Sequence, residues 1–436
     1  MGGIGTNGIR SDYLRNSLVG LEKKVPILGG HEVIPVNFDN AATTPVFRRV
    51  IDKIIETSEY YGSIGRGMGQ KSEYSTKVYN ESREYILKFF NAPADKYTAI
   101  FVNNTTEGIN RLSNMLIRDK NDVIITTRME HHSNDLPWRG KCKLDYIEVD
   151  AVGRLKFEEL ENKLDNYNGA VKYVSVTAAS NVTGYINDIY EIARIVHKYG
   201  AKLIVDGAQI VAHKRVKIMG DSNEDSIDFL VFSAHKMYAP FGSGAIIGLK
   251  ECFEEVASDL KGGGTVDTVL DYEEFYLPPP EKDEAGTPNF FGAVALVEAM
   301  KQLEIIGYDE IDSNEHSLLK RVTEGMSSIP NVISYGDTKN IDDRLGIIVF
   351  NIEGIYHAEV ARALAQIRGI AVRQGAFCAH PYVKRLLNLT DEEATKHLTN
   401  PRCKMPGMVR ASFGLYNSVD EIDVFLNTIE LISNMK

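Results

Sequence analysis

Two charged residues stand just after two apolar runs, and together they could do covalent chemistry. Asp206 follows the run 203–205, and Lys236 comes shortly after the run 229–232. In open α/β sheets, ligands bind at the carboxyl ends of such strands. A carboxylate there can keep a pyridine nitrogen protonated, which makes the ring an electron sink, and a lysine there can form a Schiff base with an aldehyde. Each residue alone has an ordinary interpretation, a helix cap or a solvated side chain, but the pair is a much rarer combination.

Hydroxyl groups near two strand ends predict a site for a phosphate. Ser233 and His235 directly precede Lys236, and both suit an anion bound beside that lysine. Thr105 and Thr106 follow another predicted strand, where hydroxyls and free backbone N–H groups at a helix N-terminus bind anions without a basic residue. A simple threonine cap would also explain this second pair, and the two interpretations are compatible.

An imidazole after another strand could stack on a planar ring. His131 lies in the segment EHHSN at 130–134, which follows a predicted strand ending near Thr127. Its neighbour His132 raises the alternative of a metal site, but adjacent histidines point in different directions and no third ligand is evident. The sequence therefore predicts a stacking residue and no metal.

The elements that must position these residues are those of a parallel sheet wrapped by helices. Between about residues 37 and 248, short β-rich runs alternate with amphipathic stretches, which is typical of an α/β domain. The predicted strands are 98–102, 122–126, 171–177, 202–205, 229–232 and 245–248. Helices are predicted at 72–90 and 189–199, where apolar residues recur at helical spacing.

The sequence of the C-terminal third predicts a smaller α+β domain. Residues 262–289 contain a glycine triplet, an acidic stretch and three consecutive prolines, which favour an extended loop, and a long helix is predicted from near Phe291. Ser418 and Glu421 form a capping box for a last helix at 419–434. The other predicted elements are strands at 345–352, 370–374 and 409–415, a helix at 357–368 and a polar insertion at 389–406.

Length and composition fit a two-domain enzyme that acts on a small soluble molecule. A chain of 436 residues with 43% hydrophobic and 25% charged residues is typical of globular proteins. We predict an N-terminal arm at 1–36 that packs with the small domain, a large domain at 37–290 and a small domain at 291–436. The absence of a long apolar run and a net charge of -11 disfavour membranes and nucleic acid as partners. Four scattered cysteines without a secretory signal predict reduced thiols and a cytoplasmic location.

Two short patterns at the N-terminus carry little information. Residues 1–6 fit the loose N-myristoylation pattern, but a glycine-rich start of this kind arises easily by chance. Residues 3–8 match G-x-G-x-x-G, yet no strand can precede them, so the pattern fails as a dinucleotide-binding fingerprint.

An ordered set of motifs resembles the class V aminotransferases, and within them the group II cysteine desulfurases and selenocysteine lyases. The matching segments are DNAAT at 39–43, TTEGIN at 105–110, EHHSN at 130–134, SNVTG at 180–184, DGAQ at 206–209, SAHK at 233–236, AGTPN at 285–289 and VRAS at 409–412. One such match would be weak, but the set spans nearly the whole chain. The resemblance implies fold type I of the pyridoxal-phosphate-dependent transferases: a large domain with a mainly parallel seven-stranded sheet wrapped by helices, and a smaller α+β C-terminal domain.

The same resemblance implies a role for each candidate residue. Lys236 would hold pyridoxal 5'-phosphate as a Schiff base, Asp206 would pair with the ring nitrogen, and His131 would stack on the ring. The other implied cofactor ligands are Gln209 at the phenolic oxygen, Thr106, Ser233 and His235 at the phosphate with Thr105 beside them, and Thr287 at the phosphate of the neighbouring subunit in a homodimer with shared active sites. The implied substrate-binding residues are Asn181, Arg410, Arg66 and Asn40, of which Asn181 and Arg410 hold the carboxylate and Arg66 lies near the entrance.

Cys378 decides which activity the resemblance implies. In cysteine desulfurases, a cysteine on a small-domain loop attacks the sulfur of the bound substrate, which releases alanine and leaves a persulfide for a sulfur-acceptor protein. Family members often carry histidine where Ala376 and Phe377 stand, and the stretch between Cys378 and Arg410 is longer here. A nearby cation favours the thiolate, and His380 could supply it. A purely structural cysteine is the alternative.

Four interpretations follow, and they differ in the residues they need. A cysteine desulfurase needs both Lys236 and Cys378, whereas another class V enzyme, such as an aminotransferase, a β-lyase or an epimerase acting on an amino acid, needs only Lys236. A nicotinamide-dependent oxidoreductase is disfavoured because no glycine fingerprint follows a strand. A cofactor-free scaffold is disfavoured because every expected cofactor contact is present.

Overall fold

In the computed structural model, which describes residues 13–222 and 224–435, the main element is a seven-stranded sheet with the order β4-β10-β9-β8-β7-β5-β6. Its strands are β4 (Tyr97–Val102), β5 (Val123–Thr127), β6 (Lys143–Ile147), β7 (Val171–Thr177), β8 (Lys202–Asp206), β9 (Phe229–Ser233) and β10 (Gly244–Leu249). The neighbours from β6 across to β9 pair in parallel, and β10 is antiparallel to both β4 and β9. The predicted mainly parallel sheet is confirmed, while β6 was not predicted.

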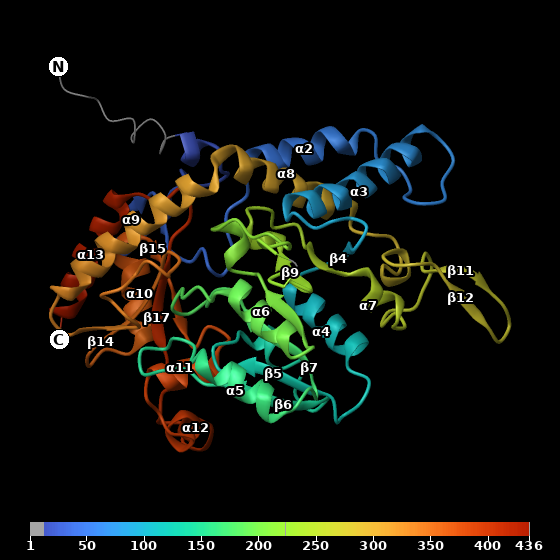
Figure 1. Cartoon of the computed structure of the whole chain (residues 1–436). Helices are drawn as coiled ribbons and strands as arrows, with labels where there is room; N and C mark the ends of the chain where they lie inside the picture. Colours follow the sequence, from blue (N-terminus) through green and yellow to red (C-terminus); the bar gives the residue numbers. More distant parts are fainter. Residues whose placement is uncertain (1–12, 223, 436) are drawn as a thin grey trace.

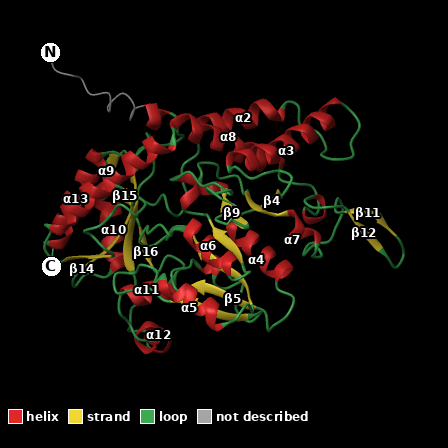
Figure 2. Ribbon diagram, in the orientation of Figure 1, coloured by secondary structure: helices red, strands yellow, loops and turns green. Residues whose placement is uncertain are grey.

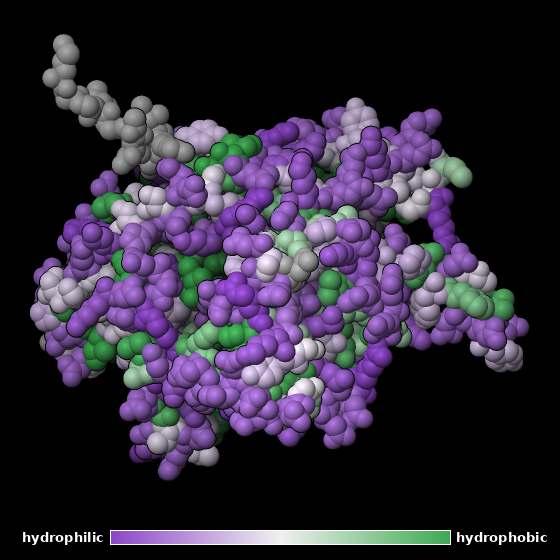
Figure 3. Space-filling view, viewed as in Figure 1, coloured by the Kyte–Doolittle hydropathy of each residue, from purple (hydrophilic) through white to green (hydrophobic). Residues whose placement is uncertain are grey.

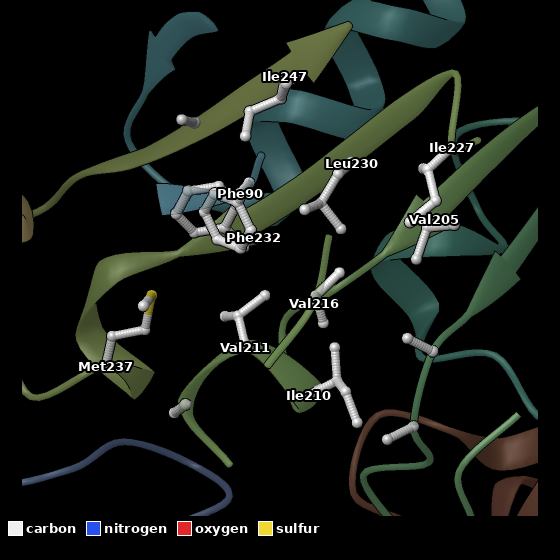
Figure 4. Close-up of a cluster of buried hydrophobic side chains, with 14 of the residues drawn as sticks. Phe90, Val205, Ile210, Val211, Val216, Ile227, Leu230, Phe232, Met237 and Ile247 are labelled. Atoms are coloured by element: carbon white, nitrogen blue, oxygen red, sulfur yellow. The ribbon is translucent and has the colours of Figure 1, made fainter. Parts of the chain in front are cut away.

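Helices cover both faces of this sheet, so its central strands are apolar without alternation. In β8, Val205 faces one hydrophobic core and Ile204 faces the other. The first core includes Leu230 and Ile247 of the neighbouring strands, and Figure 4 shows them together with Met237. The helices of this domain are α2 (Arg48–Ser58), α3 (Gln70–Phe89), α4 (Thr105–Leu116), α5 (Glu158–Asn166), α6 (Ile189–Lys198), α7 (Lys250–Glu254) and α8 (Phe290–Ile306).

The C-terminal part forms a second, smaller core around a four-stranded antiparallel sheet with the order β13-β14-β17-β16. Its strands are β13 (Val332–Tyr335), β14 (Ile347–Ile352), β16 (Arg373–Gly375) and β17 (Met408–Ser412), and its long helices are α9 (Tyr308–Ser327), α10 (His357–Arg368) and α13 (Val419–Ser433). The predicted capping box of Ser418 and Glu421 at the start of α13 is confirmed. Figure 2 shows these helices packed beside the sheet at the left of the molecule.

The N-terminal segment pairs with a short strand of the C-terminal part of the chain. The hairpin of β1 (Val25–Pro26) and β2 (Glu32–Val33) is followed by β3 (Val36–Asn37), which pairs in parallel with β15 (Ile370–Ala371). Helix α8 packs against α2 and α3 in one layer over the large sheet (Figure 1). The division of the chain at residues 36 and 290 stays a prediction, with α8 lying on the side of the large sheet.

The prediction of an extended loop at 262–289 was wrong. This segment contains a hairpin of β11 (Val266–Val269) and β12 (Glu274–Tyr276), which projects from the molecule in Figure 1. Its glycines and prolines flank the hairpin instead of interrupting it, because they lie at 262–264 and 278–280. Figure 3 shows hydrophobic residues on this projection, and Val269 and Leu270 of the hairpin are exposed.

The polar insertion at 389–406 is partly helical. It contains α12 (Asp391–Thr399), which starts with a capping box of Thr390 and Glu393 and follows α11 (His380–Leu386). The N-terminal patterns at 1–6 and 3–8 lie outside the described residues. Among the described helices, none has an apolar stretch long enough to span a bilayer.

Candidate active site

A cavity of about 470 Å³ lies between the carboxyl ends of the large sheet's strands and the small domain. The predicted site residues that line it are Thr105, Thr106, His131, Asn181, Asp206, Gln209, Ser233, His235, Lys236, Cys378 and Arg410. They come from the carboxyl ends of five strands of the large sheet and the segments that follow them, and from one loop and strand β17 of the small domain. The fold therefore brings together residues that are far apart in the sequence, such as Thr105 and Arg410.

Lys236 reaches the cavity through a short turn at the end of β9. The turn η3 (Ala234–Lys236) follows Ser233 directly, and the next residue, Met237, is fully buried in the core drawn in Figure 4. Lys236 Nζ makes no hydrogen bond or ion pair with a described residue. Burial lowers the pKa of Lys236 from 10.5 to about 8, although the Asp206 carboxylate opposes this shift. The amine is therefore available as a nucleophile near neutral pH.

Asp206 is a buried carboxylate at the end of β8. One oxygen, Oδ1, accepts a hydrogen bond from Ala208 N at 2.9 Å, and no described residue forms an ion pair with it. Burial raises the pKa of Asp206, and the charge of Lys236 partly offsets this effect. An unpaired buried carboxylate is costly unless a ligand compensates it. A protonated ring nitrogen is a ligand of the right charge and hydrogen-bonding type.

Four hydroxyl-bearing residues meet in two pairs at the start of α4. The backbone N–H of Thr105 donates to Ser233 Oγ at 2.7 Å, and the hydroxyls of these two residues are also 2.7 Å apart. Thr106 Oγ1 lies 2.6 Å from Ser133 Oγ. The helix N-terminus and its hydroxyls form a site suited to an anion such as phosphate. His235 lies close by, with Nδ1 3.2 Å from Thr43 Oγ1.

The His131 ring is fixed and kept neutral. Its Nδ1 accepts a hydrogen bond from Ser133 N at 3.1 Å and lies 2.9 Å from Ser133 Oγ. Burial, followed by the charge of Lys236, lowers the pKa of His131 to about 3. A neutral, immobile imidazole is well suited to stack on an aromatic ring.

Behind His131 lies a buried network centred on Glu130. The carboxylate of Glu130 accepts hydrogen bonds from Thr127 Oγ1 (2.7 Å), Thr177 N (3.0 Å) and Asn134 Nδ2 (2.7 Å). Burial raises the pKa of Glu130 to about 8 despite these donors. Asn134 N in turn donates to the carbonyl of His131 at 2.8 Å, so the network holds the backbone of His131 in place.

Replacing Glu130 with alanine should destabilise the large domain. The substitution leaves three buried donors without an acceptor, and each unsatisfied group costs about 1–3 kcal/mol. The midpoint of urea denaturation should therefore fall clearly. The exposed Glu392 is a matched control, because its replacement with alanine should leave the midpoint unchanged. Equal midpoints for both variants would contradict the role of the network.

Arg410 and Asn181 present unpartnered polar atoms to the cavity. Arg410 is 2% exposed; its Nη1 donates to Asn181 O at 2.7 Å and its Nη2 to Asp39 Oδ1 at 3.2 Å. Arg410 Nε and Asn181 Oδ1 are buried and have no hydrogen-bond partner among the described residues. Burial lowers the pKa of Arg410 to about 10. A small polar ligand with a carboxylate would satisfy Nε.

Cys378 is exposed at the rim of the cavity on a loop with an unusual backbone. Phe377 and Cys378 both have positive φ angles, 51° and 54°. Two hydrogen bonds hold this conformation: His132 N donates to Cys378 O at 2.6 Å, and Asn181 Nδ2 donates to Phe377 O at 2.7 Å. A non-glycine residue in this region is strained, which is typical of functional sites.

The sequence suggested His380 as the cation beside Cys378, whereas the structure favours arginine. His380 stacks on His132 with ring centroids 4.8 Å apart, and its Nδ1 lies 3.0 Å from His132 Nε2. Burial lowers the pKa of His380, so its protonated form is disfavoured. Arg373 and Arg410 are cationic side chains that line the same cavity as Cys378.

Three predicted site residues do not line this cavity. Asn40 is buried and donates to Ser412 O at 3.0 Å and to Asn417 Oδ1 at 3.2 Å, so it joins the two domains. Thr287 lines a separate cavity of about 220 Å³. Arg66 Nη2 donates to the carbonyl of Val266 at 2.9 Å, on the projecting hairpin.

Sequence reasoning also missed residues that line the cavity, among them Ser133, Thr177, Arg373 and Phe377. Ser133 could have been found, because it lies two residues after His131 in the same turn. Thr177 ends β7, Arg373 begins β16 and Phe377 lies in the loop before Cys378. Within the described residues, no cluster of histidine, cysteine and acidic side chains could hold a metal ion.

Comparisons with known proteins agree with this geometry. Residues 36–425 match the family model described as Aminotransferase class-V. A probable cysteine desulfurase of Pyrococcus abyssi is 36% identical over 419 residues, which cover 94% of this chain and 96% of that protein. Another from Halalkalibacterium halodurans is 35% identical over 404 residues, covering 91% and 92% of the two chains. The apo structure of cysteine desulfurase from Thermococcus onnurineus NA1 superposes with a TM-score of 0.82 at 33% identity and covers 92% of this chain and 95% of its own.

These likenesses and the seven-stranded sheet confirm the predicted fold type I architecture. The match to the family model covers nearly the whole chain, including every residue that lines the cavity. The chain therefore belongs to the class V aminotransferase family.

Proposed function

We propose that the protein is a pyridoxal-phosphate-dependent cysteine desulfurase, which takes sulfur from L-cysteine, releases alanine and keeps the sulfur as a persulfide on Cys378. One observation carries this proposal: the cavity brings a low-pKa lysine and an unpaired carboxylate together with an exposed cysteine. The relatives named as cysteine desulfurases support the same activity.

The residues present fit the cofactor. Lys236 Nζ would bond covalently to its aldehyde carbon, Asp206 would hold its ring nitrogen protonated, and His131 would stack on the ring. The phosphate would lie against the hydroxyls of Thr105, Thr106 and Ser233 with His235 nearby, and Gln209 would contact the phenolic oxygen. When bound, the cofactor supplies an electron sink that stabilises negative charge at the substrate α-carbon.

The protein's own groups then perform four tasks. Arg410 and Asn181 orient the amino acid through its carboxylate. Lys236, as a neutral amine, takes the proton from the α-carbon and later returns a proton to the product. The Cys378 thiolate attacks the substrate sulfur, so that a sulfur–sulfur bond forms while the carbon–sulfur bond of the substrate breaks. The electron pair of that broken bond ends as a C–H bond of alanine after protonation.

Cofactor capture should depend on pH in a way that reports the state of Lys236. Only the neutral amine attacks an aldehyde, and the pKa of Lys236 is lowered to about 8 by burial. The rate at which apo-protein binds pyridoxal 5'-phosphate should therefore rise with pH and level off above about 8. Stopped-flow absorbance measures this rate. An inflection near 10.5, the ordinary value for lysine, would contradict the lowered pKa.

Product analysis separates this activity from its rivals. Incubation with L-cysteine and a reductant should release sulfide and alanine in equal amounts. A β-lyase would instead yield pyruvate and ammonia, an aminotransferase would consume a 2-oxo acid, and an epimerase would yield the D-amino acid. Any of these products in place of alanine would reject the desulfurase proposal.

The assembly and its partners are further parts of the proposal. We infer a homodimer in which Thr287 serves the phosphate site of the neighbouring subunit, because Thr287 does not reach the cavity of its own chain. A sulfur-acceptor protein would take the persulfide from the exposed Cys378. A cytoplasmic location is consistent with the reduced thiols that this chemistry needs.

A further inference from the structure

The residue that precedes Cys378 is held by the two residues proposed to bind the substrate carboxylate. Asn181 Nδ2 donates to Phe377 O at 2.7 Å, and the Arg410 guanidinium lies over the Phe377 ring, 5.1 Å from its centroid. Arg410 Nη1 also donates to Asn181 O at 2.7 Å. These contacts close a triangle of Asn181, Phe377 and Arg410, which we call the clamp, and Cys378 is covalently attached to it.

The conformation of the Cys378 loop depends on such contacts. Phe377 and Cys378 have consecutive positive φ angles of 51° and 54°. Strained backbone of this kind persists only where the surroundings over-determine it. The carbonyl groups of both residues accept hydrogen bonds from the large domain, from Asn181 and His132 respectively. A change in the clamp therefore changes how firmly Cys378 is placed.

The clamp is incomplete in the structure. Arg410 Nε is a buried donor without a partner among the described residues, and Asn181 and Arg410 both line the cavity. An amide nitrogen carries two donors, and one bond is observed from Asn181 Nδ2. A donor from each residue thus remains for an anionic ligand, and a carboxylate has the oxygens to bridge them.

We propose that the carboxylate of the amino-acid substrate completes the clamp, and that Asn181, Phe377 and Arg410 thereby couple carboxylate recognition to the placement of Cys378. The proposal rests on the proposed function in taking Cys378 as the sulfur-accepting residue. An ionic bridge is stronger than a neutral hydrogen bond and strengthens the bonds connected to it. A substrate that lacks the carboxylate would bind the cofactor but leave the loop loosely held.

Hydrogen–deuterium exchange of the peptide that covers residues 374–380 tests this coupling in the cofactor-loaded protein. L-Alanine carries the amine and the carboxylate but no sulfur, and ethylamine carries the amine alone. At concentrations that saturate the change in cofactor absorption, alanine should slow exchange about fivefold or more, within the range of ordinary couplings. Ethylamine should leave the exchange rate unchanged. Equal protection by ethylamine would overturn the proposal.

Two variants distinguish the coupling from simple shielding by a ligand. Asn181→Ala removes the bond to Phe377 O, so saturating alanine should no longer protect the loop. Phe377→Leu keeps apolar bulk but removes the ring under Arg410, so protection should fall. Full protection in either variant that folds overturns the proposal. Because no turnover is needed, carboxylate-dependent protection without sulfide release would keep the coupling and reject only the desulfurase assignment.

Discussion

Lys236→Ala should abolish sulfide release and remove the absorption band of the lysine-bound cofactor. The loss should be about 10³-fold or more, because removing a residue that acts covalently and then moves a proton eliminates both tasks. No other described lysine can replace it, because Lys236 is the lysine that lines the cavity. Absorbance spectra and a sulfide assay on the same preparation measure both effects.

The control for this variant is Lys120→Ala. Lys120 is exposed between α4 and β5, away from the cavity, so its replacement should leave the spectrum and the rate unchanged. Substantial sulfide release by Lys236→Ala with a normal cofactor band would contradict the assignment.

Cys378→Ser should lose sulfide release by a similar factor while it keeps the cofactor band. A hydroxyl is a far weaker nucleophile towards sulfur than a thiolate, and Cys378 is not among the residues expected to bind the cofactor. The spectral change on adding L-cysteine should therefore persist without turnover. Cys403→Ser, in the same domain and half-buried, is the matched control and should stay active. Full activity of Cys378→Ser would favour another class V reaction.

Much of the large domain could be predicted from local patterns. Strands β7 and β8 are short, mostly buried segments with an apolar centre, so the sequence marks their bounds to within a residue. The antiparallel direction of β10 and the pairing of β6 depend on long-range contacts and have no local signal. The hairpin of β11 and β12 was missed because glycines and prolines dominate the surrounding segment.

Some features of the candidate site could likewise be predicted from local patterns, and others could not. Asp206, Ser233 and Lys236 could be predicted because each stands at or shortly after the carboxyl end of a buried strand, which fixes its place at one edge of the sheet. The contact between Asn181 and Phe377 could not, since 196 positions separate them in the sequence. The unpartnered state of Arg410 Nε likewise depends on packing between the two domains.

Borohydride trapping tests the central claim most directly. The reagent reduces the carbon–nitrogen double bond between a lysine and the cofactor to a stable amine, and peptide mass spectrometry then locates the modified residue. We predict one pyridoxyl-phosphate adduct per chain, on Lys236. An adduct on a different lysine, or no adduct in protein saturated with pyridoxal 5'-phosphate, would contradict the account.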